Sequence, residues 1–454
     1  MSRQNVDLGS GSVGKLLFSL AVPTITSQIV NMLYNLVDRV YIGHMQPVET
    51  VGKLALTGVG VCLPIIMVIS AFAALLAMGG APRASIEEGR GNSGEAERIM
   101  GNCFAMLVIV SLVLTVVFRV FARPMLMTFG ASENTIGYAL DYIGIYLLGT
   151  IFVQFALGLN TFISAQGKAL VAMLSVLIGA ILNIVLDPIF IFVFNWGVQG
   201  AALATILSQI LSAFLAFRRL TRTRACYRVN WRRIRFEGPM LRQVVTLGIP
   251  SGVQSSVVSL ANVIVQANIN ASGCGAYSKI EGFAFLPVTC FALALSTFVS
   301  QNIGARRFDR VRQGMKFGLI CSPVLAELIG VAIFTLAPFL IALFNSDPTV
   351  VSFGVDDART VSLFYCLLSF SHCCAGILRG MGRPVVPMAI MLCVWCALRI
   401  TYITVTVHFI PDIHVVYWAY PLTWAISSVL FLFCLRRMRF PSEEHGEPVS
   451  YIRG

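Results

Sequence analysis

The chain is predicted to be an all-α membrane protein, with twelve transmembrane helices in two six-helix lobes related by a pseudo-two-fold axis along the membrane normal. Three observations lead to this prediction. Apolar residues make up 57% of the 454 residues and charged residues only 12%, a balance outside the range of water-soluble domains. Apolar stretches of about 20 residues recur along the chain, and each is long enough to cross a bilayer as a helix. The second half of the chain also repeats motifs of the first.

Apolar periodicity and length define the expected spans. No signal peptide is expected before the first of them, because the apolar stretch after Lys15 is too long for the hydrophobic region of a signal. In chain order, the expected spans are 16–42, 54–78, 97–120, 136–162, 169–194, 200–217, 242–270, 276–299, 314–340, 356–378, 384–408 and 415–435.

Basic residues explain the formal net charge of +12. They gather after every second span, most densely at 218–242 and 306–316, while the opposite loops hold few of them. Under the positive-inside rule the basic loops face the cytoplasm, so both termini are expected inside. The charge is therefore a topology signal in a multi-pass protein whose partner is the lipid bilayer, and no nucleic-acid partner is expected.

An internal repeat defines the expected lobes. Leu20-Ala21-Val22-Pro23 is matched in the second half of the chain by Leu247-Gly248-Ile249-Pro250, and Gln166-Gly167-Lys168 is matched by Met381-Gly382-Arg383. Six helices per repeat give both lobes the same orientation, with the substrate path between them. We expect an N-lobe at 1–217, a basic cytoplasmic linker at 218–241 and a C-lobe with a cytoplasmic tail at 242–454. Because such a path lies within one chain, a monomer is sufficient.

Two acidic residues lie inside apolar runs, Asp38 in the first span and Asp187 in the fifth. An aspartate near the centre of a membrane helix costs roughly 3 kcal/mol, so each calls for a partner, a wet cavity or a function. Pro23 and Pro188 each remove a backbone hydrogen bond from their helix, which predicts bend points that are either mobile or static.

Polar side chains form matching stripes on the first and seventh spans. Gln28, Asn31 and Asn35 lead to Asp38 on one helical face, and Asn262 and Gln266 lie on the seventh span at similar spacing. Two matching stripes indicate the lining of a substrate cavity. The alternative is hydrogen bonding between helices that only holds the bundle together.

A set of short motifs resembles the multidrug and toxic compound extrusion (MATE) family, most closely its proton-coupled, MepA-like bacterial members. The resemblance covers nearly the whole chain. It rests on Leu56-Thr57-Gly58-Val59-Gly60 with Pro64, Gly79-Gly80-Ala81-Pro82 leading to Gly101-Asn102, Ala165-Gln166-Gly167, the set Asn183, Asp187 and Pro188, and Leu378-Arg379-Gly380.

The resemblance implies an ion-coupling site in the N-lobe. By position, its members are Asp38, Asn183, Asp187 and Thr205, with Tyr142 in the same hydrogen-bond network. The coupling ion is H⁺ or Na⁺, and no other metal, cofactor or catalytic residue is expected. Another branch of the family carries acids on the seventh and tenth helices, whereas this chain has Gln254 and Ser255 at the first of these places and Leu368 to Ser371 at the second.

The function expected from these features is secondary active efflux of amphipathic organic cations in exchange for H⁺ or Na⁺ by alternating access, in a bacterial inner membrane. The near-match Gly9-Ser10-Gly11-Ser12-Val13-Gly14-Lys15-Leu16 is not a phosphate-binding loop, because Leu16 replaces the Ser or Thr that would hold magnesium. No nucleophile and base stand at recognisable spacing, so an enzyme is not expected. The alternative is a flippase for lipids or lipid-linked oligosaccharides, whose cavity should be strongly basic.

Glu281 in the eighth span is expected either to attract cationic substrates into the cavity or to pair with Lys279 or Arg399. If it attracts substrate, Glu281→Gln should reduce export of a cationic dye while export of a neutral compound of similar size is retained, because only the cation loses an electrostatic contact. Efflux assays with the two compounds check this. An equal loss for both compounds contradicts the charge role.

Overall fold

The computed structural model describes the backbone of residues 10–45, 49–223, 227–271, 277–342, 347–410 and 412–437. The side chains of residues 49–50, 232 and 255–271 and of 277–279 lie outside the described part. Where the chain is described, its regular structure is helical and includes no β-strand. This agrees with the physics of a bilayer, because a helix satisfies its backbone hydrogen bonds within one segment.

Internal contacts divide the chain into two compact units. Of the described residues, the first unit holds 22–248 and the second holds 10–21 and 249–437. Helices α1 (Val13–Gly43) and α8 (Gly238–Ala271) therefore each contribute to both units. The lobe boundaries expected near 217 and 242 remain a prediction.

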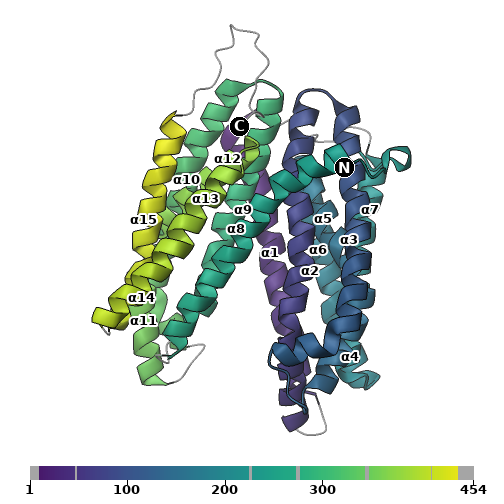
Figure 1. The fold of residues 1–454 in the computed structure, drawn as a ribbon, viewed down its shortest axis with the longest axis vertical. Coiled ribbons are helices and arrows are strands. Elements are labelled where there is room, and N and C mark those ends of the chain that lie inside the picture. The colour runs from purple at the N-terminus through teal and green to yellow at the C-terminus, as the bar shows by residue number, and fades with distance from the viewer. Residues whose placement is uncertain are drawn as a thin grey trace. The chain divides into compact units, whose positions relative to one another are not determined.

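The first unit is a helical bundle whose members are coloured from purple to teal in Figure 1. Besides its parts of α1 and α8, it contains α2 (Glu49–Gly89), α3 (Ser93–Thr128), α4 (Ile136–Leu148), α5 (Thr150–Ala165), α6 (Ala169–Pro188), the π-helix η1 (Ile189–Val193), α7 (Gly197–Arg222) and the 3₁₀ turn η2 (Trp231–Arg233). Its core combines apolar residues of α2 to α5 and α7, among them Ile65, Phe118 and Phe162.

The second unit, green to yellow in Figure 1, repeats this plan. It contains α9 (Tyr277–Gly304), α10 (Phe308–Ala342), α11 (Pro348–Ser362), α12 (Tyr365–Gly380), α13 (Val385–Met391), the π-helix η3 (Leu392–Leu398), α14 (Arg399–Phe409) and α15 (Ile413–Arg437). Its core is richer in large aromatic side chains, with Trp395, Trp424 and Tyr365 all buried.

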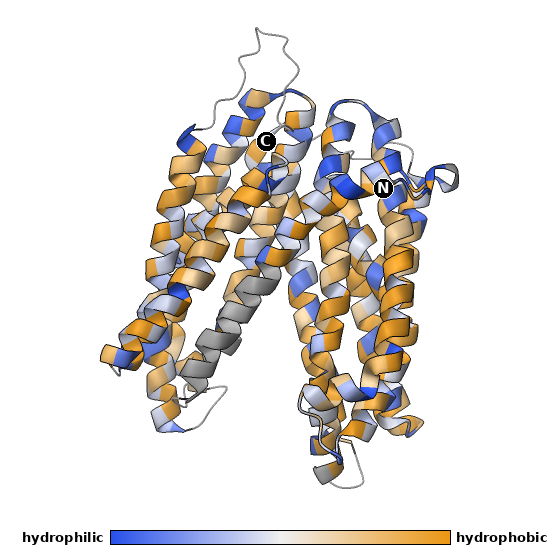
Figure 2. Ribbon diagram, viewed as in Figure 1, coloured by the Kyte–Doolittle hydropathy of each residue, from blue (hydrophilic) through white to orange (hydrophobic). Residues whose placement is uncertain are grey.

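The helices are long and apolar enough to span a membrane, as expected. Within the described residues nine qualify on their own, and eleven qualify when each of two bent pairs is counted as one span. The remaining expected span, 242–270, falls on α8. Figure 2 shows hydrophobic residues along the bodies of α3 and α15, with hydrophilic residues near their ends. The predicted fold class is confirmed.

Two spans expected to be single helices are broken. The helix axis turns by 58° between α4 and α5, and by 53° between α11 and α12. At the first break the Thr115 hydroxyl donates to the Leu147 carbonyl (3.1 Å), and at the second the Glu327 carboxylate accepts from the backbone N–H of Cys366 (3.0 Å). Side chains from neighbouring helices thus satisfy backbone groups freed by the breaks, which hydropathy alone does not reveal.

The internal repeat is visible as repeated hydrogen bonds. The Ser85 hydroxyl donates to the Ala165 carbonyl at 3.1 Å, and Ser300 in the second unit donates to the Gly380 carbonyl at the same distance. Gly167 and Gly382 both have φ +76°. The register that aligns Ser85 with Ser300 also aligns Ala165 with Gly380 and Gly167 with Gly382. A residue in one unit can therefore be compared with its counterpart in the other.

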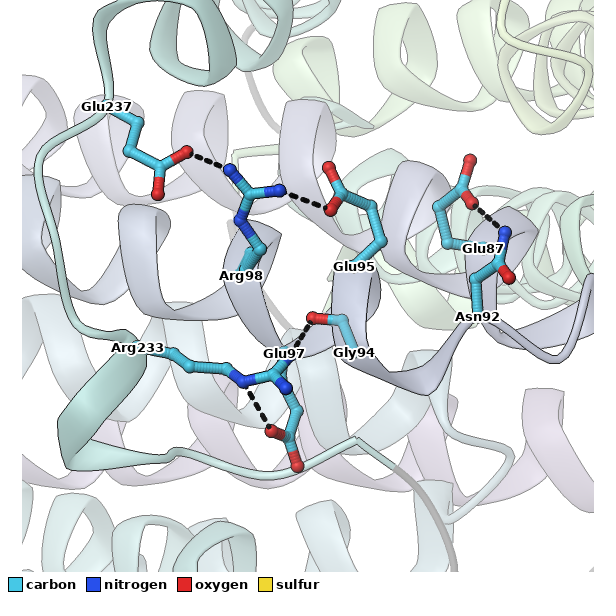
Figure 3. Close-up of polar contacts among 8 residues, drawn as sticks. All are labelled: Glu87, Asn92, Gly94, Glu95, Glu97, Arg98, Arg233 and Glu237. Carbon is cyan, nitrogen blue, oxygen red and sulfur yellow. Dashed lines mark hydrogen bonds and ion pairs between the residues drawn. The ribbon is translucent and has the colours of Figure 1, made fainter.

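The basic segment expected as a linker is packed onto α3 of the first unit (Figure 3). Glu97 on α3 pairs with Arg228 (3.5 Å) and Arg233 (3.4 Å), and Arg233 also donates to the Gly94 carbonyl. Arg98 pairs with Glu237 at 2.6 Å, just before α8 begins. Several charges in one network hold a segment better than one exposed ion pair would, so the start of α8 is fixed to this unit.

Arg306 has a left-handed backbone (φ 57°), whereas Gly91 stands at the equivalent place in the first unit with φ +81°. An L-residue pays roughly 1–2 kcal/mol in this region, and glycine does not. Arg306→Gly should therefore raise the free energy of unfolding by about 1 kcal/mol, measured by thermal unfolding in detergent. Ala305→Gly, one residue earlier and hydrogen-bonded to the Gln301 carbonyl, is the control and should destabilise. The same sign for both variants contradicts this explanation.

Candidate ion-binding site

The site begins with two polar residues of α6 that face the interior of the first unit. Asn183 and Asp187 are four residues apart, so they share one face of the helix. Both are buried, and the Asn183 amide donates to Asp187 Oδ1 at 3.2 Å. Asp187 is directly followed by Pro188 and the π-helix η1. A π-helical turn widens the backbone and often marks a functional position.

Asp38 approaches this pair from α1. Its side chain is buried, and it lies within electrostatic range of Asp187. Tyr142 on α4 lies in range of Asp38 and makes a side-chain hydrogen bond with Thr205 on α7. The structure thus brings four helices of one unit together through the five residues that the sequence proposed for this site.

Two further residues belong to this network and were missed by the sequence reasoning. Tyr34 lies in range of both Asp38 and Asp187, and the Gln209 amide donates to its hydroxyl at 3.5 Å. A signal was present in the sequence, because Tyr34 is one helical turn before Asp38 and Gln209 is one turn after Thr205. Spacing shows which residues share a face, but it does not show which faces of different helices meet.

Three acceptor oxygens of the site are left without a hydrogen bond. Asp38 Oδ1, Asn183 Oδ1 and Asp187 Oδ2 are all buried and have no donor among the described residues. Buried acceptors need a donor or a cation, and two carboxylates in one apolar site are costly if both are charged. The arrangement is suited to bind a proton or a small cation that prefers oxygen ligands.

The family model for MatE matches residues 23–189 and 256–404, which together are more than half of the chain. The chain belongs to the MatE family. The expected family is therefore confirmed, and the protein is a multi-pass membrane transporter rather than an enzyme. The first matched segment ends two residues after Asp187, so it includes Asp38, Tyr142 and the α6 pair.

Similar proteins cover most of the chain at low identity. A probable multidrug resistance protein, YpnP of Bacillus subtilis, is 24% identical over 87% of this chain and 88% of its own length. The multidrug export protein MepA of Staphylococcus haemolyticus is 22% identical over 84% of both chains. The FAD transporter of Shewanella oneidensis is 22% identical over 85% of this chain and 86% of its own.

Solved MatE-type structures share the fold. One described as the outward-facing conformation of a multidrug resistance MATE family transporter superposes with a TM-score of 0.87 at 22% identity, covering 96% of this chain and 98% of the other. A MOP superfamily transporter from Pyrococcus furiosus gives the same score and coverage.

The residues proposed for a substrate cavity are only partly placed by the structure. On α1, Gln28 and Asn35 are exposed and Asn31 is half-buried, and the Asn35 amide donates to the Asn31 carbonyl at 2.6 Å. Asn262 and Gln266 lie outside the residues with described side chains. A cavity lining of this MatE transporter therefore stays a prediction.

The two expected bend points differ in local structure. Helix α1 continues through Pro23, and the Ser27 hydroxyl donates to the Pro23 carbonyl at 3.0 Å. At Pro188 the helix changes from α to π geometry.

Glu281, the remaining proposed residue, lies on α9 of the second unit within electrostatic range of Arg399. Its Oε1 is buried without a hydrogen-bond donor among the described residues, so pairing with Arg399 and a role toward substrate both stay predictions.

Tyr142→Phe tests the network at the point where the Tyr142 hydroxyl meets Thr205. Loss of one buried hydrogen bond should lower the free energy of unfolding by about 1 kcal/mol, measured by thermal unfolding in detergent. Tyr138→Phe, one turn earlier on α4 and without such a bond in the described structure, is the matched control and should change stability by less than about 0.5 kcal/mol. Equal effects of the two variants contradict the proposed bond.

Proposed function

We propose that this MatE protein is a secondary active antiporter that exports amphipathic organic cations in exchange for H⁺ or Na⁺ by alternating access. The observation that carries the proposal is the group of unpaired, buried oxygens of Asp38, Asn183 and Asp187. Acidic side chains buried in a membrane protein are expensive and mark ion pathways.

The charge of the site suggests how ion binding and substrate binding are coupled. When both carboxylates are ionised, the site carries a negative charge that favours a cation. When H⁺ or Na⁺ is bound, that attraction falls and helix α1, which carries Asp38, is free to repack. Ion and substrate therefore bind in competition, and by linkage each lowers the affinity for the other.

The names of relatives support export of small organic molecules, since several are multidrug resistance or export proteins. One relative is a FAD transporter, so the substrate panel should contain a cationic dye and FAD. The acidic character of the first-unit site favours the cation. It also makes the flippase alternative less well supported, because a pyrophosphate-bearing lipid requires a basic cavity.

The proposal includes a bacterial inner-membrane location with both termini in the cytoplasm, for which the alternating pattern of basic loops is the support. It also includes a monomer as the working unit. The ion site lies within one unit of a single chain, so no second copy is needed to complete it.

Asp38→Asn and Asp187→Asn each keep the side-chain shape but remove the charge that the ion and the substrate share. In proteoliposomes, efflux of a fluorescent cationic dye should be driven by either a proton or a sodium gradient in the wild type. It should fall at least tenfold in both variants, because more than about 1.4 kcal/mol of differential binding is lost. The gradient that drives the wild type identifies the coupling ion.

Asp141→Asn is the control, since Asp141 is the exposed neighbour of Tyr142 on α4 and should leave efflux unchanged. Folding of each variant is checked by its unfolding temperature. Gradient-driven efflux that persists in both Asp38→Asn and Asp187→Asn contradicts this assignment of the coupling site.

A further inference from the structure

The motif Gly101-Asn102 of the sequence analysis has no part in the ion site and instead holds the packed linker, residues 227–237 between α7 and α8. Gly101 lies so close to the Arg233 carbonyl that any side chain at this position would collide with it. The Asn102 amide donates to the Glu237 carbonyl at 3.1 Å. In Figure 3, the side chains of Arg233 and Glu237 point toward α3. The motif therefore shapes the place where the linker backbone packs.

The inner face of the linker is buried in the first unit. Tyr227 is fully buried, its hydroxyl donates to the Phe162 carbonyl at 3.3 Å, and its own carbonyl accepts from the Gln166 amide at 2.8 Å. Val229 is buried as well, and its N–H donates to the Leu220 carbonyl of α7 at 3.1 Å. These contacts make the linker a fixed part of the surface of this unit, so the residues on its outer face are held in place.

The outer face of the linker carries two large aromatic side chains. Trp231 is 67% exposed and Phe236 is 58% exposed. The Trp231 ring is also packed edge-on, with its centroid 5.5 Å from that of Phe217 on α7 and 6.5 Å from that of Phe104 on α3. A tryptophan that packs on one side and is exposed on the other is typical of the membrane interface, where its amphipathic ring lies at headgroup level.

Helix α7 shows that Trp231 lies at the end of a membrane span. Phe214, Arg218 and Arg222 follow one another at four-residue steps on one helical face, and all three are exposed. Each step advances roughly 6 Å along the helix, so this face changes from apolar to basic within one turn. Phe217, on which Trp231 packs, lies in that turn. Trp231 is therefore beside the boundary between the apolar and the basic part of α7.

Positive charge at this boundary is not balanced by the acids nearby. Glu97 on α3 and Glu237 on the linker are each already paired with arginine. Three further arginines at the end of α7 and on the linker are exposed and form no ion pair among the described residues. They are Arg218, Arg222 and Arg235. A guanidinium presents parallel N–H donors that match two oxygens of a phosphate group.

We propose that the outer face of the packed linker, together with the end of α7, binds the headgroups of anionic phospholipids. The three arginines donate to phosphate oxygens, while Trp231 and Phe236 lie among the headgroups and the first acyl carbons. An acidic soluble protein would meet the same charges, but the continuity of Trp231 with the exposed apolar face of a span favours lipid. Because the linker holds the start of α8 to the first unit, bound lipid anchors both to one leaflet. The inference does not depend on antiport.

Binding is measured on the full chain in detergent, as the rise in unfolding temperature when phosphatidylglycerol is titrated, with phosphatidylcholine of the same acyl chains as the reference. A ligand that binds the folded state raises this temperature. Phosphatidylglycerol should bind the wild type more tightly than phosphatidylcholine. Arg218→Gln/Arg222→Gln/Arg235→Gln should weaken its binding at least about tenfold, since each basic group near an anionic lipid surface contributes roughly fivefold.

The matched control is Lys316→Gln/Arg436→Gln/Arg437→Gln, which removes the same charge from exposed positions of the second unit and should change binding by less than about twofold. An equal loss in both triple variants overturns the site, because binding then follows net charge alone. Inorganic phosphate should not raise the unfolding temperature. Equal stabilisation by phosphate overturns the lipid assignment in favour of a free anion, and no preference for phosphatidylglycerol in the wild type overturns the proposal outright.

The place of binding is measured by quenching of tryptophan fluorescence in nanodiscs that contain brominated phosphatidylglycerol or brominated phosphatidylcholine. The excess quenching by the anionic lipid should be lost in Trp231→Phe. It should persist in Trp418→Phe, which removes a tryptophan of the second unit that is 50% exposed. Excess quenching that survives in Trp231→Phe overturns the placement of the lipid at the linker.

Discussion

The cost of leaving a polar group unpaired in hydrocarbon is the constraint on which this structure depends. It requires helices, because only they pair every backbone group within one segment of this chain. It also requires that backbone groups freed at a break in a helix be hydrogen-bonded by a side chain from another helix. Thr115 does so at Leu147 in the first unit, and Glu327 does so at Cys366 in the second. Where the constraint is not met, as at the buried oxygens of Asp38 and Asp187, the exception points to a ligand.

Duplication gives the two units one backbone plan and leaves their polar chemistry free to differ. The matched bonds of Ser85 and Ser300 show how closely the backbone is kept. Yet Tyr142 in the first unit corresponds to Asp357 in the second, and the cation that acts on Asp38 is the exposed Arg39, whereas Arg399 is buried. Among the described residues, both units have buried acid oxygens without a hydrogen-bond donor, and the second unit also has a buried arginine, Arg399, whose charge acts on Glu281.

The packed linker fixes the start of α8 to the first unit, and this bears on where α1 and α8 can bend. Glu97 and Glu237 hold the segment before α8 to the first unit, while α8 belongs to the second unit from Ile249 onward. Helix α1 runs in the opposite order: it belongs to the second unit up to Ala21 and to the first unit from Val22 onward. Both changes occur within continuous helices and directly before Pro23 and Pro250. Proline removes a backbone hydrogen bond at such points, so local bending there costs less than elsewhere in the helix.

The sequence alone predicted the helix positions and the family, and through the family resemblance it proposed five residues for the first site. It could do so because membrane helices are defined by local hydropathy, and because a buried aspartate is conspicuous in an apolar run. Only the tertiary structure decided which helix faces meet. It added Tyr34 and Gln209 to the first site and showed that two spans expected to be continuous are broken. It also placed Asp357 within electrostatic range of Glu281. Contacts between distant segments depend on how the helices pack. The spacing and composition of a single helix show which of its residues share a face, but not which other helix that face meets.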